Sequence, residues 1–269
     1  MFYPPELPQR LELQFAADRF STIEVNTTFY AQPTPETYRA WRSQVPANFV
    51  FALKGPRTMT HELRLKDTEP ALAVFFRSGI LELGPHLGPI LWQLPSNMRF
   101  DAGQIEAFLS LLPRTTAAAS VLCRRHSAMG TGSAAGGTEE RNRRLRHAFE
   151  VRHESFMDPT FLDLLRAHGA AVACCAEAGL PAFSAVTADF VYCRLMGGGS
   201  GEEGGYDADT LSQWVERAKT WATGAEPADA ARIGGRPSRP QRDVFVFLDT
   251  AMRLRAPANA LEMIRRIRA

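Results

Sequence analysis

Short apolar runs recur along the chain, and each ends in a polar or charged residue. Six of them lie at 23–26, 49–54, 89–93, 147–153, 190–194 and 244–249. Most are followed by a loop and then by a segment in which apolar residues recur with helical spacing. This alternation predicts parallel strands of an α/β fold, whose reactive side chains gather at the carboxyl ends of the strands.

The pattern also predicts where the individual elements lie. Strands are expected at 22–26, 49–54, 89–94, 147–152, 170–175, 189–195 and 244–249. Helices are expected at 7–20, 35–44, from Asp67 or Thr68 to 83, at 101–112 with Asp101 as its cap, and at 117–126, 159–168, 209–221 and 258–268. The Gly-rich stretches 127–142, 197–206 and 224–241 are expected to be flexible loops.

Seven strands, each followed by a helix or a long crossover, predict a TIM-type (β/α) barrel. Eight strands close such a barrel, and the leading helix has no strand before it, so the first strand is expected to be missing. No internal repeat and no boundary between two cores is visible, which predicts one domain over residues 1–269.

Composition narrows the class of protein. The net charge is +2, so nothing marks a surface for nucleic acid, and no apolar stretch has the length of a membrane span. The first residues lack the features of a secretory signal, and a cytoplasmic location is expected. Four cysteines show no metal-ligand spacing with histidine, which predicts buried free thiols, no metal and no cofactor.

Charged side chains at the strand ends predict a polar pocket. Strand alternation places Glu150 and Arg152 on one face, and likewise Glu24 with Asn26. Buried charges that lack a partner cost several kcal/mol, so these must pair with one another or with a ligand. The alternatives are therefore a pocket for a small anionic or sugar-like ligand, which we favour, and a structural ion-pair network.

Residue chemistry suggests roles within this pocket. The catalytic candidates, which could transfer protons or, for the lysine, form a Schiff base, are Glu24, Lys54, His61 and Glu150. For Lys54 an ion pair is the favoured alternative. The candidates for ligand binding are Asn26, Tyr30, Gln93, Arg152, Arg194 and Asp249. His153 is expected to face outward and to support the site indirectly.

Several motifs resemble the YecE-like family, known as domain of unknown function number 72. They lie at 23–30 (Ile-Glu-Val-Asn-Thr-Thr-Phe-Tyr), 60–61, 87–95, 150–153, 187–192 and 255–257. The resemblance implies a (β/α) barrel without an established activity. Family members usually begin with a further Gly-rich strand and carry polar residues where this chain has Met196, Ala176 and Thr250. These departures from the family pattern imply either a start codon placed too late or a paralogue with weakened chemistry.

The sequence leads to one preferred function and two alternatives. The preferred function is an enzyme that acts on a small anionic or sugar-like ligand by acid–base chemistry. The first alternative is a nucleic-acid-binding or endonuclease-like barrel, and the second is a non-catalytic paralogue. No membrane partner is expected, and the oligomeric state stays open.

Overall fold

The computed structural model describes residues 2–126, 142–177, 179–197, 205–227, 241–248 and 255–269. The predicted stretches at 127–142, 197–206 and 224–241 lie largely outside these residues. Seven strands follow one another in chain order in a parallel sheet, with helices between them. This is the α/β organisation of a TIM-type barrel, as the sequence predicts.

All seven predicted strands are present, and each boundary lies within two residues of its expected position. The strands are β1 (Thr22–Val25), β2 (Val50–Lys54), β3 (Leu87–Gln93), β4 (His147–Glu150), β5 (Ala171–Ala176), β6 (Phe190–Leu195) and β7 (Asp243–Leu248). In register, Glu24 pairs with Ala52 and Cys175 with Arg194.

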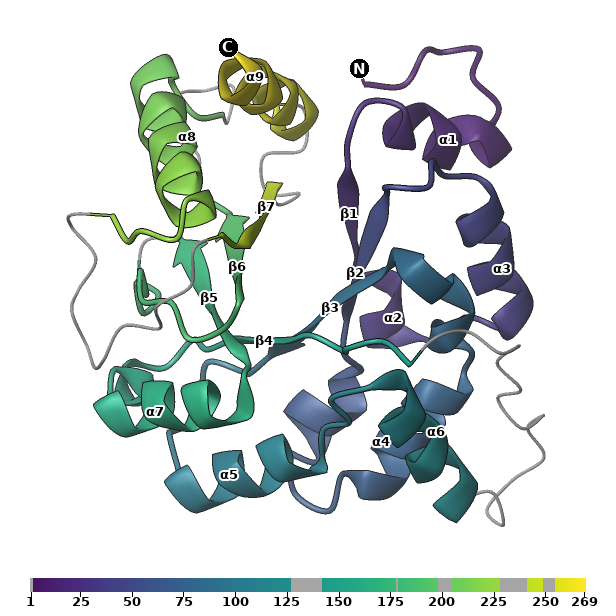
Figure 1. Cartoon of the computed structure of the whole chain (residues 1–269), viewed down its shortest axis with the longest axis vertical. Coiled ribbons are helices and arrows are strands. Elements are labelled where there is room, and N and C mark those ends of the chain that lie inside the picture. Colours follow the sequence, from purple (N-terminus) through teal and green to yellow (C-terminus); the bar gives the residue numbers. More distant parts are fainter. Residues whose placement is uncertain (1, 127–141, 178, 198–204, 228–240, 249–254) are drawn as a thin grey trace. The chain divides into compact units, whose positions relative to one another are not determined.

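Contacts group the chain into two compact units, drawn in Figure 1. The N-terminal unit is Arg10–Ala148, and the C-terminal unit is Met1–Gln9 with Phe149–Ala269. The prediction of one domain over residues 1–269 stays a prediction.

Helices of the N-terminal unit begin largely where their caps predict. They are α1 (Glu12–Ala17), α2 (Thr27–Tyr30), α3 (Pro35–Ser43), α4 (Glu69–Arg77), α5 (Ala102–Leu111) and α6 (Thr116–Arg125). The expected helix at 7–20 is shorter, with the 3₁₀ turn η1 (Gln9–Leu11) before α1. The expected helix to 83 is also wrong, because Gly79 takes a φ of 104° and separates α4 from the 3₁₀ segment η3 (Ile80–His86).

The predicted cap of α5 is confirmed. Asp101 accepts a hydrogen bond from the backbone N–H of Gln104 at 2.9 Å. At α4, by contrast, Thr68 is the cap residue but its side chain makes no capping hydrogen bond.

Replacing Asp101 with alanine should therefore lower the free energy of unfolding by about 1 kcal/mol. Asp101→Asn should retain most of the stability, since the amide oxygen can accept the same bond. Urea unfolding measures both variants, and equal losses for the two would contradict the capping role.

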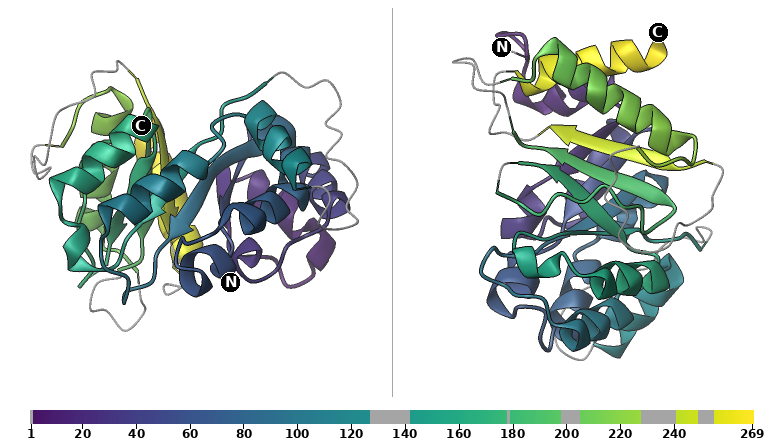
Figure 2. Two further views of the ribbon diagram at one scale, coloured as in Figure 1. Left: turned by 90° about the horizontal axis from the view of Figure 1, so that it is seen from below. Right: turned by 90° about the vertical axis from the view of Figure 1, so that its left-hand side faces the viewer.

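The C-terminal unit packs its helices onto the last strands. Its helices are the 3₁₀ turn η5 (Glu154–Phe156), α7 (Pro159–His168), α8 (Ala208–Ala222) and α9 (Ala256–Arg268). Figure 2 shows α8 and α9 beside each other along β6 and β7. Leu195 of β6, Leu211 of α8 and Met263 of α9 belong to one buried cluster. The apolar sides of two helices and two strands thus share one core.

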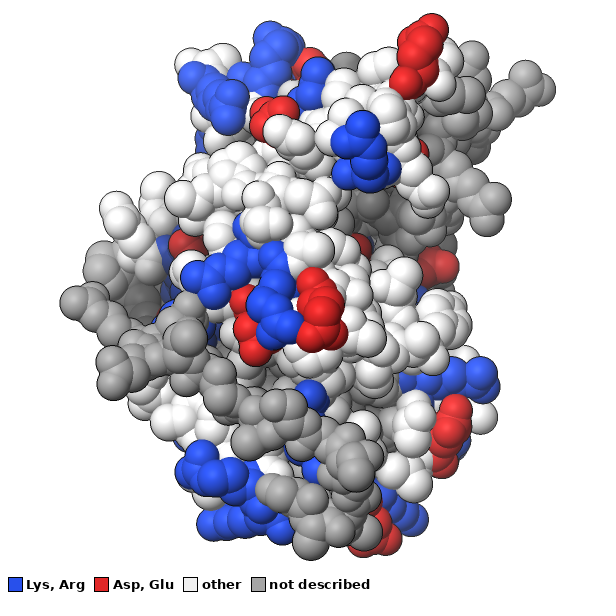
Figure 3. All heavy atoms as spheres, turned by 90° about the vertical axis from the view of Figure 1, so that its right-hand side faces the viewer, with Lys and Arg blue, Asp and Glu red and all other residues white. Residues whose placement is uncertain are grey.

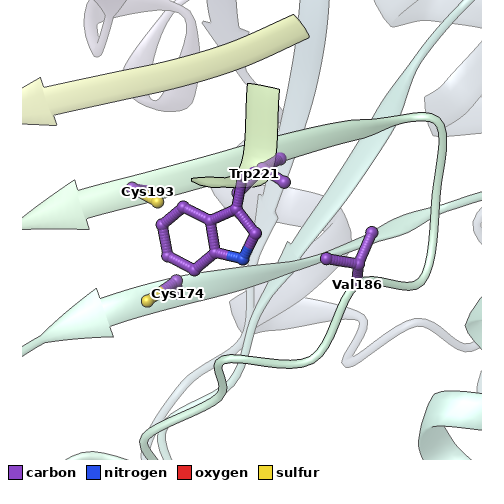
Figure 4. Close-up of a cluster of buried hydrophobic side chains, with 5 residues drawn as sticks. Cys174, Val186, Cys193 and Trp221 are labelled. Atoms are coloured by element: carbon purple, nitrogen blue, oxygen red, sulfur yellow. The ribbon is translucent and has the colours of Figure 1, made fainter. Parts of the chain in front are cut away.

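A second cluster in this unit contains two of the cysteines. Figure 4 shows the indole of Trp221 against the sulfur atoms of Cys174 and Cys193, which occupy paired positions on β5 and β6. All four cysteines are free and buried, as predicted. Burial raises the pKa of the Cys123 thiol, and those of Cys175 and Cys193 also lie well above their usual value. These three thiols are therefore protonated at neutral pH, and all four cysteines serve as small core side chains.

Candidate functional site

Four side chains at the ends of β4 and β6 form the Glu150 group, namely Glu150, Arg152, Arg194 and Met196. Glu150 is the last residue of β4, and Arg152 follows two residues later. Arg194 is the penultimate residue of β6, and Met196 comes directly after this strand. The group therefore lies at the carboxyl ends of two strands, where α/β proteins usually carry their reactive residues.

Glu150 binds both arginines of the group. Nε of Arg152 donates to Oε1 of Glu150 at 2.7 Å, and Nη1 of Arg194 donates to Oε2 at 2.5 Å. The side chains of Glu150 and Arg194 are 0% and 3% exposed, whereas that of Arg152 is 30% exposed. One buried carboxylate thus orients two guanidinium groups, of which only one reaches solvent.

The charges decide the protonation state of this carboxylate. Burial by itself raises the pKa of Glu150, but the positive charges of Arg194 and Arg152 and their hydrogen bonds outweigh it. The pKa therefore lies below its usual value, and Glu150 is ionised at neutral pH. A carboxylate held in this way is a poor general base, because protonation would break both ion pairs.

Met196 contacts both arginines of the group. Its sulfur atom is 3.4 Å from Nη1 of Arg194 and 4.0 Å from Nη2 of Arg152. A thioether is a weak acceptor for a charged donor. Nη2 of Arg152 therefore has only this weak acceptor within the described residues.

The strand is shorter than predicted, but the two expected neighbours meet. β4 ends at Glu150, and Arg152 follows outside the strand. The two side chains, two residues apart in the chain, form an ion pair of 2.7 Å. The structure brings Glu150, Arg152 and Arg194 together, while their roles as site residues stay predictions.

His153 has a structural partner. Its Nδ1 accepts a hydrogen bond from the backbone N–H of Ser155 at 3.1 Å and lies 2.9 Å from the hydroxyl of Ser155. The side chain therefore caps the 3₁₀ turn η5 that follows β4. One ring nitrogen is thus occupied by the turn, and the supporting role expected for His153 stays a prediction.

The N-terminal unit carries a second group, which we call the Phe29 cluster: Asn26, Phe29, Tyr30, Lys54 and His61. Nζ of Lys54 lies 4.2 Å from the ring centroid of Phe29. The rings of Tyr30 and His61 meet the Phe29 ring edge to face, at 5.0 and 5.1 Å between centroids. Phe29, which the sequence analysis did not single out, is thus the centre of this cluster.

The loop that carries His61 has an unusual backbone. It begins with the π-helical turn η2 (Thr58–Glu62), which the pattern did not predict. Arg64, Leu65 and Asp67 follow with positive φ angles of 50°, 66° and 49°. Such strained segments persist where surrounding contacts hold them, and they concentrate at functional sites.

Contacts from neighbouring segments hold this loop. Arg64 donates to the side-chain and backbone oxygens of Asn97 at 3.1 and 3.0 Å, and Gln104 donates to the backbone oxygen of Arg64. The hydroxyl of Thr60 lies 2.9 Å from Nδ1 of His61. The imidazole is therefore held in one orientation beside Phe29.

Three further candidates, Glu24, Gln93 and Asp249, lie elsewhere in the chain. Glu24 lies on β1, and Gln93 is the last residue of β3 and is buried. Asp249 lies outside the described residues, as does Thr250. The predicted convergence of the candidates from both units into one pocket stays a prediction.

A buried histidine that the sequence analysis missed lies at the start of β4. Nδ1 of His147 accepts a hydrogen bond from the indole N–H of Trp92 at 3.2 Å, and Nε2 lies 2.9 Å from the backbone oxygen of Pro113. Burial lowers the pKa of His147 to about 4. The ring is therefore neutral, donates from Nε2, and ties β3 and β4 to the loop before α6.

Several negative findings concern the described residues alone. They contain no group of three or more His, Cys, Asp or Glu side chains arranged to hold a metal ion. None of their helices has the length and apolar character needed to cross a membrane. On the face shown in Figure 3, acidic and basic side chains lie beside one another near the centre. The ion pairs of the described residues include those of Arg39 with Glu36 and Glu82.

Comparison with solved structures agrees with the fold. A DUF72 family protein of Thermotoga maritima MSB8 (TM1631) superposes with a TM-score of 0.72 at 21% identity, covering 99% of this chain and 93% of that one. A DUF72 family protein of Enterococcus faecalis V583 (EF0366) gives 0.66 at 18% identity, with 96% and 94% covered. At such identities the likeness concerns the fold alone.

Sequence comparison shows the family. The UPF0759 protein YecE of Escherichia coli K12 is 35% identical over 104 residues, which are 38% of this chain and 37% of YecE. The match therefore spans little more than a third of that relative. The family model described as "Protein of unknown function DUF72" matches residues 1–269. The chain belongs to the DUF72 family.

Proposed function

We propose that the protein binds a small anionic ligand at the Glu150 group, with Arg152 as the residue that contacts it. The observation that carries this proposal is the partial exposure of Arg152, whose Nε is held by a fully buried carboxylate. Because Glu150 orients the guanidinium in advance, little side-chain entropy is lost when an anion binds. Carboxylates and phosphates match the fork of donors that arginine presents.

A purely structural ion pair explains this geometry less well. Here the acid is buried while one of its two bases reaches solvent, so that base can contact a ligand without leaving its partner. The contact of Nη2 with a sulfur atom at 4.0 Å leaves a charged donor poorly satisfied. An anionic oxygen supplied by a ligand would satisfy it.

The geometry supports binding more strongly than proton transfer. Glu150, one of the four catalytic candidates, is better suited to holding arginines than to accepting a proton, since its pKa is lowered. The acid–base chemistry expected from the sequence would therefore fall to groups other than Glu150. A nucleic-acid ligand is not favoured, because the net charge of +2 supplies little of the required phosphate attraction.

Thermal unfolding at constant ionic strength tests the proposal. Inorganic phosphate, citrate and glucose 6-phosphate should each be compared with chloride. A ligand at ten times its dissociation constant should raise Tm by about 2 °C for a chain of this size. We expect at least one of these anions to do so for the natural protein.

Two variants show whether Arg152 is responsible. Arg152→Gln should abolish the shift, since the amide lacks both the charge and the fork of donors. Arg265→Gln is the matched control, because Arg265 is an exposed arginine of α9 that also pairs with a glutamate, Glu262. The proposal fails if no anion stabilises the natural protein, or if the shift persists in Arg152→Gln.

A further inference from the structure

Tyr30 is the most exposed large apolar side chain among the described residues, at 77%. It lies at the carboxyl end of β1, on the short helix α2, and not on an outer helix. Its ring meets the ring of Phe29 edge to face, at an interplanar angle of 88°. A tyrosine has only two side-chain torsions, so a ring that faces solvent can stack on a ligand at a small entropic cost.

Asn26 lies beside Tyr30 on the same short helix. It is the residue before α2 and has helical φ and ψ angles of −88° and −17°, so Asn26 and Tyr30 are four residues apart on one turn. Residues with this spacing are neighbours on a helix surface. The side chain of Asn26 makes no capping hydrogen bond, and its amide has no hydrogen-bond partner in the described part of the chain.

Thr28 and Phe29, on the same turn, are held by contacts with neighbouring segments. The hydroxyl of Thr28 lies 2.7 Å from the backbone oxygen of Lys54, to which it donates, and the amide of Gln32 donates to the backbone oxygen of Thr28 at 3.1 Å. Phe29 is packed between Lys54 and His61. Asn26 and Tyr30, which take no part in these contacts, therefore lie on a turn that its neighbours hold in place.

We infer that Asn26 and Tyr30 form a binding site for a small planar heteroaromatic ligand. The ring of the ligand stacks on Tyr30, and an edge that offers a donor and an acceptor side by side pairs with the Asn26 amide. An asparagine amide presents the complementary acceptor and donor, which is how it pairs with the N6/N7 edge of adenine. The site lies within the N-terminal unit and is independent of the anion proposed at Arg152.

A structural role does not account for these two side chains. The anchoring contacts of α2 come from Thr28 and Phe29, and the ring of Tyr30 buries little of its surface. The exposed ring of Tyr30 and the partly exposed amide of Asn26 are both accessible to a ligand. A ligand that stacks and pairs uses both.

Adenine and indole are the probes, measured by saturation-transfer NMR and titration up to about 5 mM, where fragments of this size bind. Both are flat bicyclic rings and both are neutral at pH 7. Only adenine has the edge that pairs with an amide. We expect adenine to bind more tightly than indole.

The variants separate stacking from edge pairing. Tyr30→Ala should weaken both probes about tenfold, which corresponds to the upper range of an aromatic contact. Tyr30→Phe should stay within about twofold, because the ring remains. Asn26→Ala should weaken adenine about tenfold and leave indole unchanged. Val74→Ala, at another exposed apolar side chain of this unit, is the control and should change nothing.

Each other outcome would overturn the inference. Adenine that does not bind at about 5 mM, or that binds Tyr30→Ala as well as the natural protein, excludes the site. An equal loss of adenine and indole in Asn26→Ala excludes the amide pairing. Circular dichroism melting confirms that each variant is folded. Arg152→Gln should bind adenine normally, so failure of the anion proposal leaves this result readable.

Discussion

Replacing Glu150 with alanine is expected to destabilise the protein by about 3–5 kcal/mol, the range found when one partner of a buried ion pair is removed. Arg194, which is 3% exposed, would lose a carboxylate at 2.5 Å while its own charge stays buried. Arg152 can turn toward solvent and contributes less to the loss. Urea unfolding at neutral pH measures the effect.

Two further variants keep this prediction testable if Glu150→Ala fails to fold. Glu150→Gln retains the shape and one acceptor, so it should lose less and remain measurable. Glu262→Ala removes a carboxylate that pairs with two arginines at the surface of α9, where water replaces the contact. If Glu150→Gln were no less stable than Glu262→Ala, Glu150 would not hold the group together.

The contribution of Glu150 to stability is also expected to depend on pH. Because the pKa of folded Glu150 is lowered, its stabilising effect is present above the unfolded pKa of about 4.3 and is lost as the pH falls further. The difference in stability between the natural protein and Glu150→Gln should therefore narrow in acid. A difference that widens in acid would contradict the ionised state of Glu150.

When the pH falls from 6.5 to 4, the titration of His147 is expected to lower the free energy of unfolding by up to about 3 kcal/mol. The pKa of the folded ring is about 4 and the unfolded value is near 6.5, so the unfolded chain binds a proton in this interval while the folded chain does not. Stability consequently rises with pH here. Both ring nitrogens are engaged, which leaves no place for a second proton.

Unfolding free energies across this pH range test the effect directly. His147→Gln removes the titrating group, so its stability should change less with pH than that of the natural protein, whatever its absolute value. Histidine NMR signals provide the independent check. A His147 resonance that titrates near pH 6.5 would show that the ring is accessible, against the structure.

The two proposed sites make different demands on a ligand. The Glu150 group presents a charged donor held by a buried carboxylate, and it selects for negative charge. The Asn26–Tyr30 pair presents a ring and an amide, and it selects for a flat ligand with a polar edge. Charged probes test the first site and neutral probes test the second, so the two can be judged separately.

Much of the fold could be predicted because strands and helix caps depend on residues that are close together in the sequence. The run at 244–249 became β7 within one residue, and Asp101 caps α5 as expected. The errors occurred where backbone geometry overrode periodicity. Gly79 interrupts an apolar pattern that continues to Leu83, and the π-helical turn at Thr58–Glu62 has no periodic signal of its own.

The candidate site was predictable in its residue types and less so in its contacts. Glu150, Arg152 and Arg194 stood out because charges at the ends of apolar runs are costly unless paired. The role of Phe29 could not be seen, since a phenylalanine after a strand usually joins the core. His147 was missed for a similar reason, because one polar residue at the start of a strand is a common boundary.

The sequence by itself determined the α/β class, the order of the strands and the residues that end them, since these depend on spacing along the chain. Only the tertiary structure decided which distant charges meet: Glu150 at the end of β4 pairs with Arg194 of β6. It also decided that Phe29 lies between Lys54 and His61. Such contacts join residues that are distant in sequence, and local patterns carry no information about their distances.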